Sequence, residues 1–126
     1  MHADRRELAA VFAGGCAGTL ARALLGDLLP HDAGDWPWAT FAANLAGAFL
    51  LGWLVTRWER LPRSPYRLPL LGSGLCGALT TFSALQLELL QMLDADRFGL
   101  AATYAGATLA AGLLAVVLAT SLGRRA

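Results

Sequence analysis

The chain has 126 residues, of which 56% are hydrophobic and 15% are charged, with a formal net charge of +1. A soluble domain of this length does not need so much apolar surface, so the composition predicts an integral membrane protein. The sequence has no phosphate-binding loop, zinc-protease motif, nucleophile elbow or basic–aromatic face, and therefore gives no support to an enzyme or a nucleic-acid-binding protein.

Four apolar stretches divide the chain. A helical crossing of the bilayer needs about 20 residues, and stretches of that size cover residues 8–28, 37–56, 68–93 and 98–122. The short loops between them make antiparallel neighbours. The sequence predicts an all-α protein in which residues 1–126 form a single domain of four transmembrane helices.

The arginines are unevenly distributed between the two sides of the predicted membrane domain. With four crossings, both termini and the second loop share one side, which holds eight of the ten arginines (Arg5, Arg6, Arg57, Arg60, Arg63, Arg67, Arg124 and Arg125). The other side has Arg97 alone, and Arg22 falls within the first stretch. Because the arginine-rich side of a membrane protein faces the cytoplasm, we expect a multi-pass cell-membrane protein with both termini cytoplasmic.

The first stretch carries a charge that lipid should exclude. In "GGCAGTLAR", Gly14, Gly18 and Arg22 recur every four residues and share a helix face. Arg22 could extend toward the headgroups, but a charge inside a membrane segment favours a functional role, here lining a water-filled vestibule. Asp27 and Glu88 lie nearer to segment ends, and we expect both to face the membrane interface.

The second stretch places Thr40, Asn44 and Gly47 on one helix face. Asn44 could form hydrogen bonds between helices, or it could offer its amide group to an anion. The sequence leaves both interpretations open.

The third stretch contains "GSGLCGALTTFSAL", which is poor helix-forming material because glycines and hydroxyl residues crowd its middle. Either the glycines allow close helix packing, or the helix breaks here, which lipid tolerates only where protein or a cavity covers the backbone. Carbonyl groups freed by a break suit a cation, and a helix N-terminus suits an anion. Phe82 and Leu85 follow on one face of the second half.

The fourth stretch has a polar pair, Tyr104 and Thr108, one helical turn apart. Ordinary helix packing would account for Tyr104 if it stood alone.

Three motifs in order resemble the fluoride channel family known as Fluc or CrcB. They are "GGCAGTLARALL", "NLAGAFLLGWL" and "GLCGALTTFSAL", and the resemblance covers essentially the whole chain. It implies an antiparallel dimer with two narrow fluoride pores, which exports fluoride passively from the cytoplasm and so limits its toxicity. It also implies a structural sodium ion at the dimer centre.

The resemblance further implies roles for individual residues. Asn44, Phe82 and Ser83 match the pore-lining positions, and Tyr104 and Thr108 match less closely. Arg22 matches a vestibule arginine. The resemblance implies that the third helix is broken near its middle, and the sodium ion is expected on backbone carbonyls at this break, at Gly77 and Thr80.

One position departs from the family pattern. Leu85 stands where the family signature carries a second phenylalanine, and the family architecture implies that each pore takes its two phenylalanines from different subunits. An antiparallel homodimer also needs a chain that inserts both ways, which the arginine distribution opposes. Both features favour a heterodimer with a homologous subunit over a homodimer.

Two alternatives stay open. A small proton-coupled multidrug-type transporter has similar length and helix number, but needs a membrane-buried carboxylate, and the first stretch offers only Glu7 and Asp27 near its ends. The other alternative is a partner subunit of a fluoride channel that conducts nothing itself.

Overall fold

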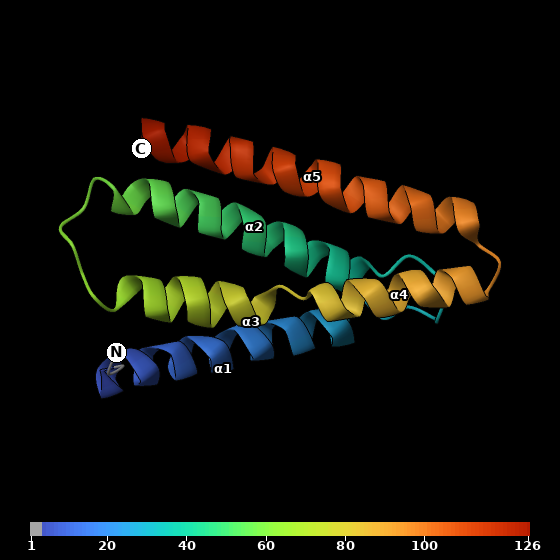
Figure 1. The fold of residues 1–126 in the computed structure, drawn as a ribbon, viewed down its shortest axis with the longest axis horizontal. Helices are drawn as coiled ribbons and strands as arrows, with labels where there is room; N and C mark the ends of the chain where they lie inside the picture. The colour runs from blue at the N-terminus through green and yellow to red at the C-terminus, as the bar shows by residue number, and fades with distance from the viewer. Residues whose placement is uncertain (1–3) are drawn as a thin grey trace.

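The computed structural model describes residues 4–126 and contains helices but no strand within that range. Four membrane segments run back and forth along the molecule (Figure 1). Their elements are α1 (Arg5–Leu28), α2 (Trp38–Trp58), the third segment formed by η1 (Leu68–Cys76), α3 (Gly77–Leu79) and α4 (Phe82–Asp94), and α5 (Phe98–Arg125).

All four segments are long and apolar enough to cross a membrane, with 24, 21, 27 and 28 residues. The predicted four-helix membrane fold is therefore confirmed, although α1 starts at Arg5 rather than residue 8 and α5 continues to Arg125 rather than residue 122. One feature was not expected: η1 is a π-helix, in which the N–H of Gly77 donates to the carbonyl of Gly72 five residues earlier. Such stretches are rare and are frequent at functional sites.

Glycines let α1 approach the third segment closely. A Cβ atom at Gly14 would overlap the carbonyl oxygen of Leu70, and one at Gly18 would overlap the carbonyl oxygen of Leu75. Gly74 faces Gly14 across the contact. The small-residue face predicted on the first stretch thus packs against backbone, as at other membrane helix interfaces.

The second large contact joins α2 to α5. A Cβ at Gly52 would lie 3.3 Å from the Cβ of Ala119, and a Cβ at Gly123 would lie 2.9 Å from the Cβ of Thr56. This contact holds α5 along the side of α2 that is far from α1 (Figure 1).

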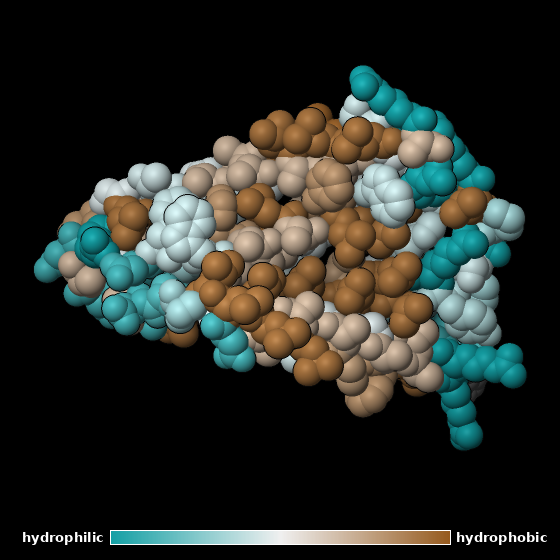
Figure 2. Space-filling model, turned by 180° about the vertical axis from the view of Figure 1, so that it is seen from behind, coloured by the Kyte–Doolittle hydropathy of each residue, from teal (hydrophilic) through white to brown (hydrophobic). Residues whose placement is uncertain are grey.

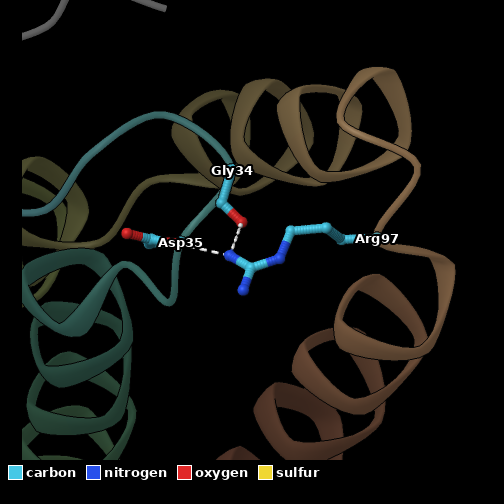
Figure 3. Close-up of polar contacts among 3 residues, drawn as sticks. All are labelled: Gly34, Asp35 and Arg97. Carbon is cyan, nitrogen blue, oxygen red and sulfur yellow. Dashed lines mark hydrogen bonds and ion pairs between the residues drawn. The ribbon is translucent and has the colours of Figure 1, made fainter.

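The two ends of the bundle differ in character. Both termini and the α2–η1 loop lie at one end, and the α1–α2 loop and the α4–α5 turn lie at the other (Figure 1). There Arg97 donates to the carbonyl of Gly34 at 3.0 Å and pairs with Asp35, which ties the α1–α2 loop to the α4–α5 turn (Figure 3). Gly34 has φ of +88°, a conformation that favours glycine.

The side surface of the bundle is apolar. Large hydrophobic side chains such as Phe12 on α1 and Leu109 on α5 are each 75% exposed. Figure 2 shows hydrophobic residues across the middle of the molecule and hydrophilic residues at both ends. A surface of this kind matches a hydrocarbon layer between two polar interfaces, so the chain is a multi-pass membrane protein.

We predict that Gly14→Ala lowers the free energy of unfolding by about 1–3 kcal/mol, because the added methyl group would push α1 away from the Leu70 carbonyl. Gly15→Ala is the matched control, since a Cβ at Gly15 meets no atom within 4 Å. Denaturant titration of both variants in detergent micelles measures the difference. Equal stabilities would show that the α1 contact tolerates a methyl group.

Candidate functional site

Two residues with extended backbone, Thr80 and Thr81, separate α3 from α4. Thr80 has φ −80° and ψ 149°, and Thr81 has φ −148° and ψ 117°. We call these residues the extended pair. Thr81 is the N-cap of α4, where its hydroxyl oxygen accepts from the N–H of Ala84 at 3.2 Å, a role for which threonine is preferred.

Asn44 on α2 holds the extended pair in place. The N–H of Thr81 donates to Asn44 Oδ1 at 2.7 Å, and Asn44 Nδ2 donates to the carbonyl of Thr81 at 3.2 Å. In a continuous helix, the same N–H would donate to the carbonyl of Gly77, four residues earlier. Asn44 therefore substitutes for a backbone partner and leaves that carbonyl without its helical donor. One amide hydrogen of Asn44 is left for another acceptor.

The neighbouring turn of α2 packs directly against the pair. A Cβ at Gly47 would overlap the methyl group of Thr80, so a larger residue would displace the threonine. The Thr80 N–H and hydroxyl both donate to the carbonyl of Cys76, at 3.1 and 2.9 Å. The face of Asn44 and Gly47 predicted from their spacing is thus the face that contacts the extended pair.

A groove of about 260 Å³ opens at this place, lined by Asn44, Thr80, Thr81, Phe82, Leu85 and Thr108. Phe82 is 71% exposed. The hydroxyl oxygen of Thr108 is buried and has no hydrogen-bond partner among residues 4–126. The groove therefore combines an amide, an unpaired hydroxyl and an aromatic ring, which are groups that can face an anion.

The other two residues predicted to line a pore lie elsewhere. Ser83 is exposed, with its hydroxyl 3.2 Å from that of Thr81, and it does not line this groove. Tyr104 is fully buried, and its hydroxyl donates to Glu88 Oε2 at 2.8 Å. The structure thus brings together Asn44, Phe82, Leu85 and Thr108, but neither Ser83 nor Tyr104.

Arg22 reaches the same region from α1. Its Nε donates to the carbonyl of Ala78 at 3.1 Å, close to the end of α3. Its side chain also lines a second hollow, of about 380 Å³, which Thr40 and Thr81 border as well. Arg22 therefore lines a recess beside the extended pair, and it donates a hydrogen bond to a carbonyl near the end of α3.

The expectation that Glu88 faces the interface was wrong. Glu88 is only 8% exposed, its Oε1 accepts from the Thr40 hydroxyl at 2.5 Å, and its Oε2 accepts from Tyr104. Hydrogen bonds from both hydroxyls offset the cost of burying its carboxyl group. The signal that could have revealed it is its spacing from Leu85 and Met92, which places all three on the inward face of α4. Asp27 is exposed near the end of α1.

Aromatic residues pack around Tyr104, which donates to this carboxyl group. The ring centroid of Trp36 lies 5.1 Å from that of Tyr104 and 5.4 Å from that of Phe41, in edge-to-face arrangements. Met92 and Ala101 complete the core cluster with Tyr104, and Leu85 packs against it. Leu85 thus contacts the core on one side and the groove on the other.

The family of the chain follows from comparison with known proteins. The family model described as CrcB-like protein, Camphor Resistance (CrcB), matches residues 9–120. The chain belongs to the CrcB family. The matched range includes every residue that lines the groove or the Arg22 recess.

Several relatives are similar over nearly their whole length. The fluoride-specific ion channel FluC 1 of Mycolicibacterium paratuberculosis is 60% identical over 123 residues, which cover 97% of this chain and 93% of the relative. FluC 1 of Mycobacterium tuberculosis is 58% identical with the same coverage. FluC of Ruegeria pomeroyi is 44% identical over 91% of this chain and 88% of the relative. Because this family consists of ion channels, the chain is not an enzyme.

We predict that Glu88→Leu lowers the free energy of unfolding by about 1–3 kcal/mol more than Glu88→Gln does, because leucine leaves two buried hydroxyl groups without a partner. Glutamine has nearly the same shape and keeps an acceptor for one hydroxyl and a donor for the other. Denaturant titration in detergent micelles compares the two. If the Glu88→Leu variant is as stable as the Glu88→Gln variant, the hydrogen bonds to Glu88 do not support the fold.

Proposed function

We propose that this chain is a subunit of a fluoride-selective channel that lets fluoride leave the cytoplasm passively and so limits its toxicity. The observation that carries the proposal is the groove beside the extended pair, where Asn44, Phe82 and the unpaired hydroxyl of Thr108 meet. The names of the similar proteins, which are fluoride-specific ion channels, support the same ion.

The chemistry of the groove suits fluoride. Fluoride is small and strongly hydrated, so a pathway must replace its water with hydrogen-bond donors. The Thr108 hydroxyl and the second amide hydrogen of Asn44 are such donors, and the ring of Phe82 offers a positive edge. Arg22 would raise the local concentration of anions at the entrance. A narrow pathway with these donors disfavours the larger chloride ion.

A structural sodium ion is part of the proposal. Sodium takes oxygen ligands, and unwound backbone supplies carbonyls for it in other membrane proteins. The carbonyl of Gly77 loses its helical donor to Asn44, and Thr80 lies in extended backbone, so both fit a carbonyl site. In residues 4–126 no group of three or more His, Cys, Asp or Glu forms a metal site. A bound sodium ion would stabilise the extended pair and would not be transported.

We further propose an antiparallel dimer. One chain forms only an open groove in which Phe82 is largely exposed, so a closed pore needs a second wall. The arginine distribution supports a single orientation with both termini cytoplasmic. Leu85 also lines the groove where a second aromatic ring is expected. A homologous subunit of opposite orientation would meet both requirements, which favours a heterodimer over a homodimer.

The function is tested by fluoride efflux from liposomes, with chloride as the comparison ion. We expect fast, fluoride-selective efflux when the chain is co-expressed with a homologous subunit, and little when it is alone. Fast efflux from the chain alone would rule out an obligatory heterodimer. If neither preparation shows fluoride efflux, a multidrug-type transporter or a non-conducting subunit is favoured.

We predict that Thr108→Val lowers the fluoride rate of the conducting complex by about tenfold or more, because the ion loses a hydrogen-bond donor. The substitution should not destabilise the chain, since this hydroxyl has no partner among the described residues. Thr103→Val on the same helix is the control, because its exposed hydroxyl donates only to the carbonyl of Gly99. An unchanged rate for Thr108→Val would remove this residue from the pathway.

We predict that Leu85→Phe raises the fluoride rate of the conducting complex, because the ring adds a positive edge to the groove. Leu90→Phe serves as the control, since Leu90 is 54% exposed and does not line the groove. The same efflux assay measures both. A rate that does not rise with Leu85→Phe contradicts the idea that leucine impairs a pore.

A further inference from the structure

The end of the bundle that carries both termini is strongly basic. Its side chains include eight arginines and three acidic residues (Asp4, Glu7 and Glu59), whereas the opposite end holds five aspartates and Arg97. Long hydrophilic side chains project from this end in the space-filling view (right side of Figure 2). Half of these arginines belong to the α2–η1 loop and the helix turn before it: Arg57, Arg60, Arg63 and Arg67.

The loop between α2 and η1 forms a hollow of about 430 Å³, lined by Trp58, Pro62, Arg63, Ser64, Pro65 and Arg67. No carboxylate lines it. Arg67 is half-buried, and its Nη1 donates to the carbonyl of Pro62 at 2.8 Å, which fixes the guanidinium group in the loop. The remaining N–H groups of Arg67, the exposed Arg63 and the Ser64 hydroxyl are left to bind an oxyanion.

Exposed leucines flank in the chain the residues that line this hollow. Leu61 is 41% exposed and Leu68, at the start of η1, is 55% exposed. Trp58, at the end of α2, also lines the hollow, and tryptophan is enriched at the membrane interface. The lining thus combines guanidinium groups with tryptophan and prolines, and exposed leucines lie directly before Pro62 and directly after Arg67 in the chain, so the site suits an amphipathic anion better than a free phosphate ion.

We propose that the α2–η1 loop binds the phosphodiester headgroup of an anionic phospholipid, with Arg63 and Arg67 on the phosphate, Trp58 beside the glycerol region, and Leu61 and Leu68 against the acyl chains. Basic pockets at the ends of membrane helices bind such headgroups in other proteins. The proposal does not depend on fluoride conduction, because it concerns the start of the third segment and the loop before it, whereas the groove lies at the middle of that segment.

The test uses the full chain purified in a neutral detergent, with dioleoylphosphatidylglycerol as the probe and dioleoylphosphatidylcholine as the neutral lipid. Native mass spectrometry counts the lipids that stay bound at increasing lipid concentration. We expect phosphatidylglycerol to be retained in preference to phosphatidylcholine. The double variant Arg63→Gln/Arg67→Gln should bind it roughly 30-fold more weakly, because two arginine contacts are lost.

The control is Arg124→Gln/Arg125→Gln, which removes the same charge from the same end of the bundle but from outside the hollow. It should retain the lipid nearly as well as the unmodified chain. Equal losses in both variants would show general charge attraction and overturn the proposal. Displacement of the lipid by millimolar inorganic phosphate would assign the site to free phosphate and overturn it too.

Because Arg67 also supports the loop, Arg63→Gln alone is a second variant that keeps the bond to Pro62. It should weaken phosphatidylglycerol binding while leaving thermal stability without lipid unchanged. Full retention of the lipid by Arg63→Gln would contradict the assigned contact.

Discussion

A bilayer offers no water to an open backbone, and this constraint shapes the middle of the third membrane segment. The extended pair exposes peptide groups that a helix would have paired internally. Asn44 satisfies both the N–H and the carbonyl of Thr81, and the Thr81 side chain caps α4. Without these bonds the pair would leave polar groups unpaired inside the membrane, at a cost of several kcal/mol per group. Asn44 on α2 thus replaces the helical partners of Thr81, and the groove forms where the helix is interrupted.

Close packing of α1 against η1 and α3 supports the interrupted third segment on the side away from Asn44. Gly14 and Gly18 let the backbone of α1 contact η1, and one turn later Arg22 reaches the carbonyl of Ala78. The guanidinium group thus serves as a structural donor and lines the recess beside Thr81. A single glycine face therefore links the packing of two helices to the position of a positive charge beside the extended pair.

Glu88 shows how a polar residue can belong to the core of a membrane domain. Thr40 from α2 and Tyr104 from α5 both donate to it, so three helices meet around one carboxyl group. Each donor lies one turn before a groove residue, Thr40 before Asn44 and Tyr104 before Thr108. The hydroxyl–carboxyl cluster therefore sets the position of the helix turns that carry the groove.

The sequence by itself determined the four membrane segments, the arginine-rich end and the family, because hydropathy, charge and motifs are local properties of the chain. It also predicted that Asn44, Phe82, Leu85 and Thr108 belong to one site. Only the tertiary structure decided that Glu88 is buried and that Tyr104 donates a hydrogen bond to it. It also decided that Ser83 lies outside the groove and that Asn44 binds the backbone of Thr81. These outcomes depend on how each helix is rotated against its neighbours. That rotation is set by contacts between residues far apart in the chain, such as 37 positions for Asn44 and Thr81 and 56 for Arg22 and Ala78, which no local pattern encodes.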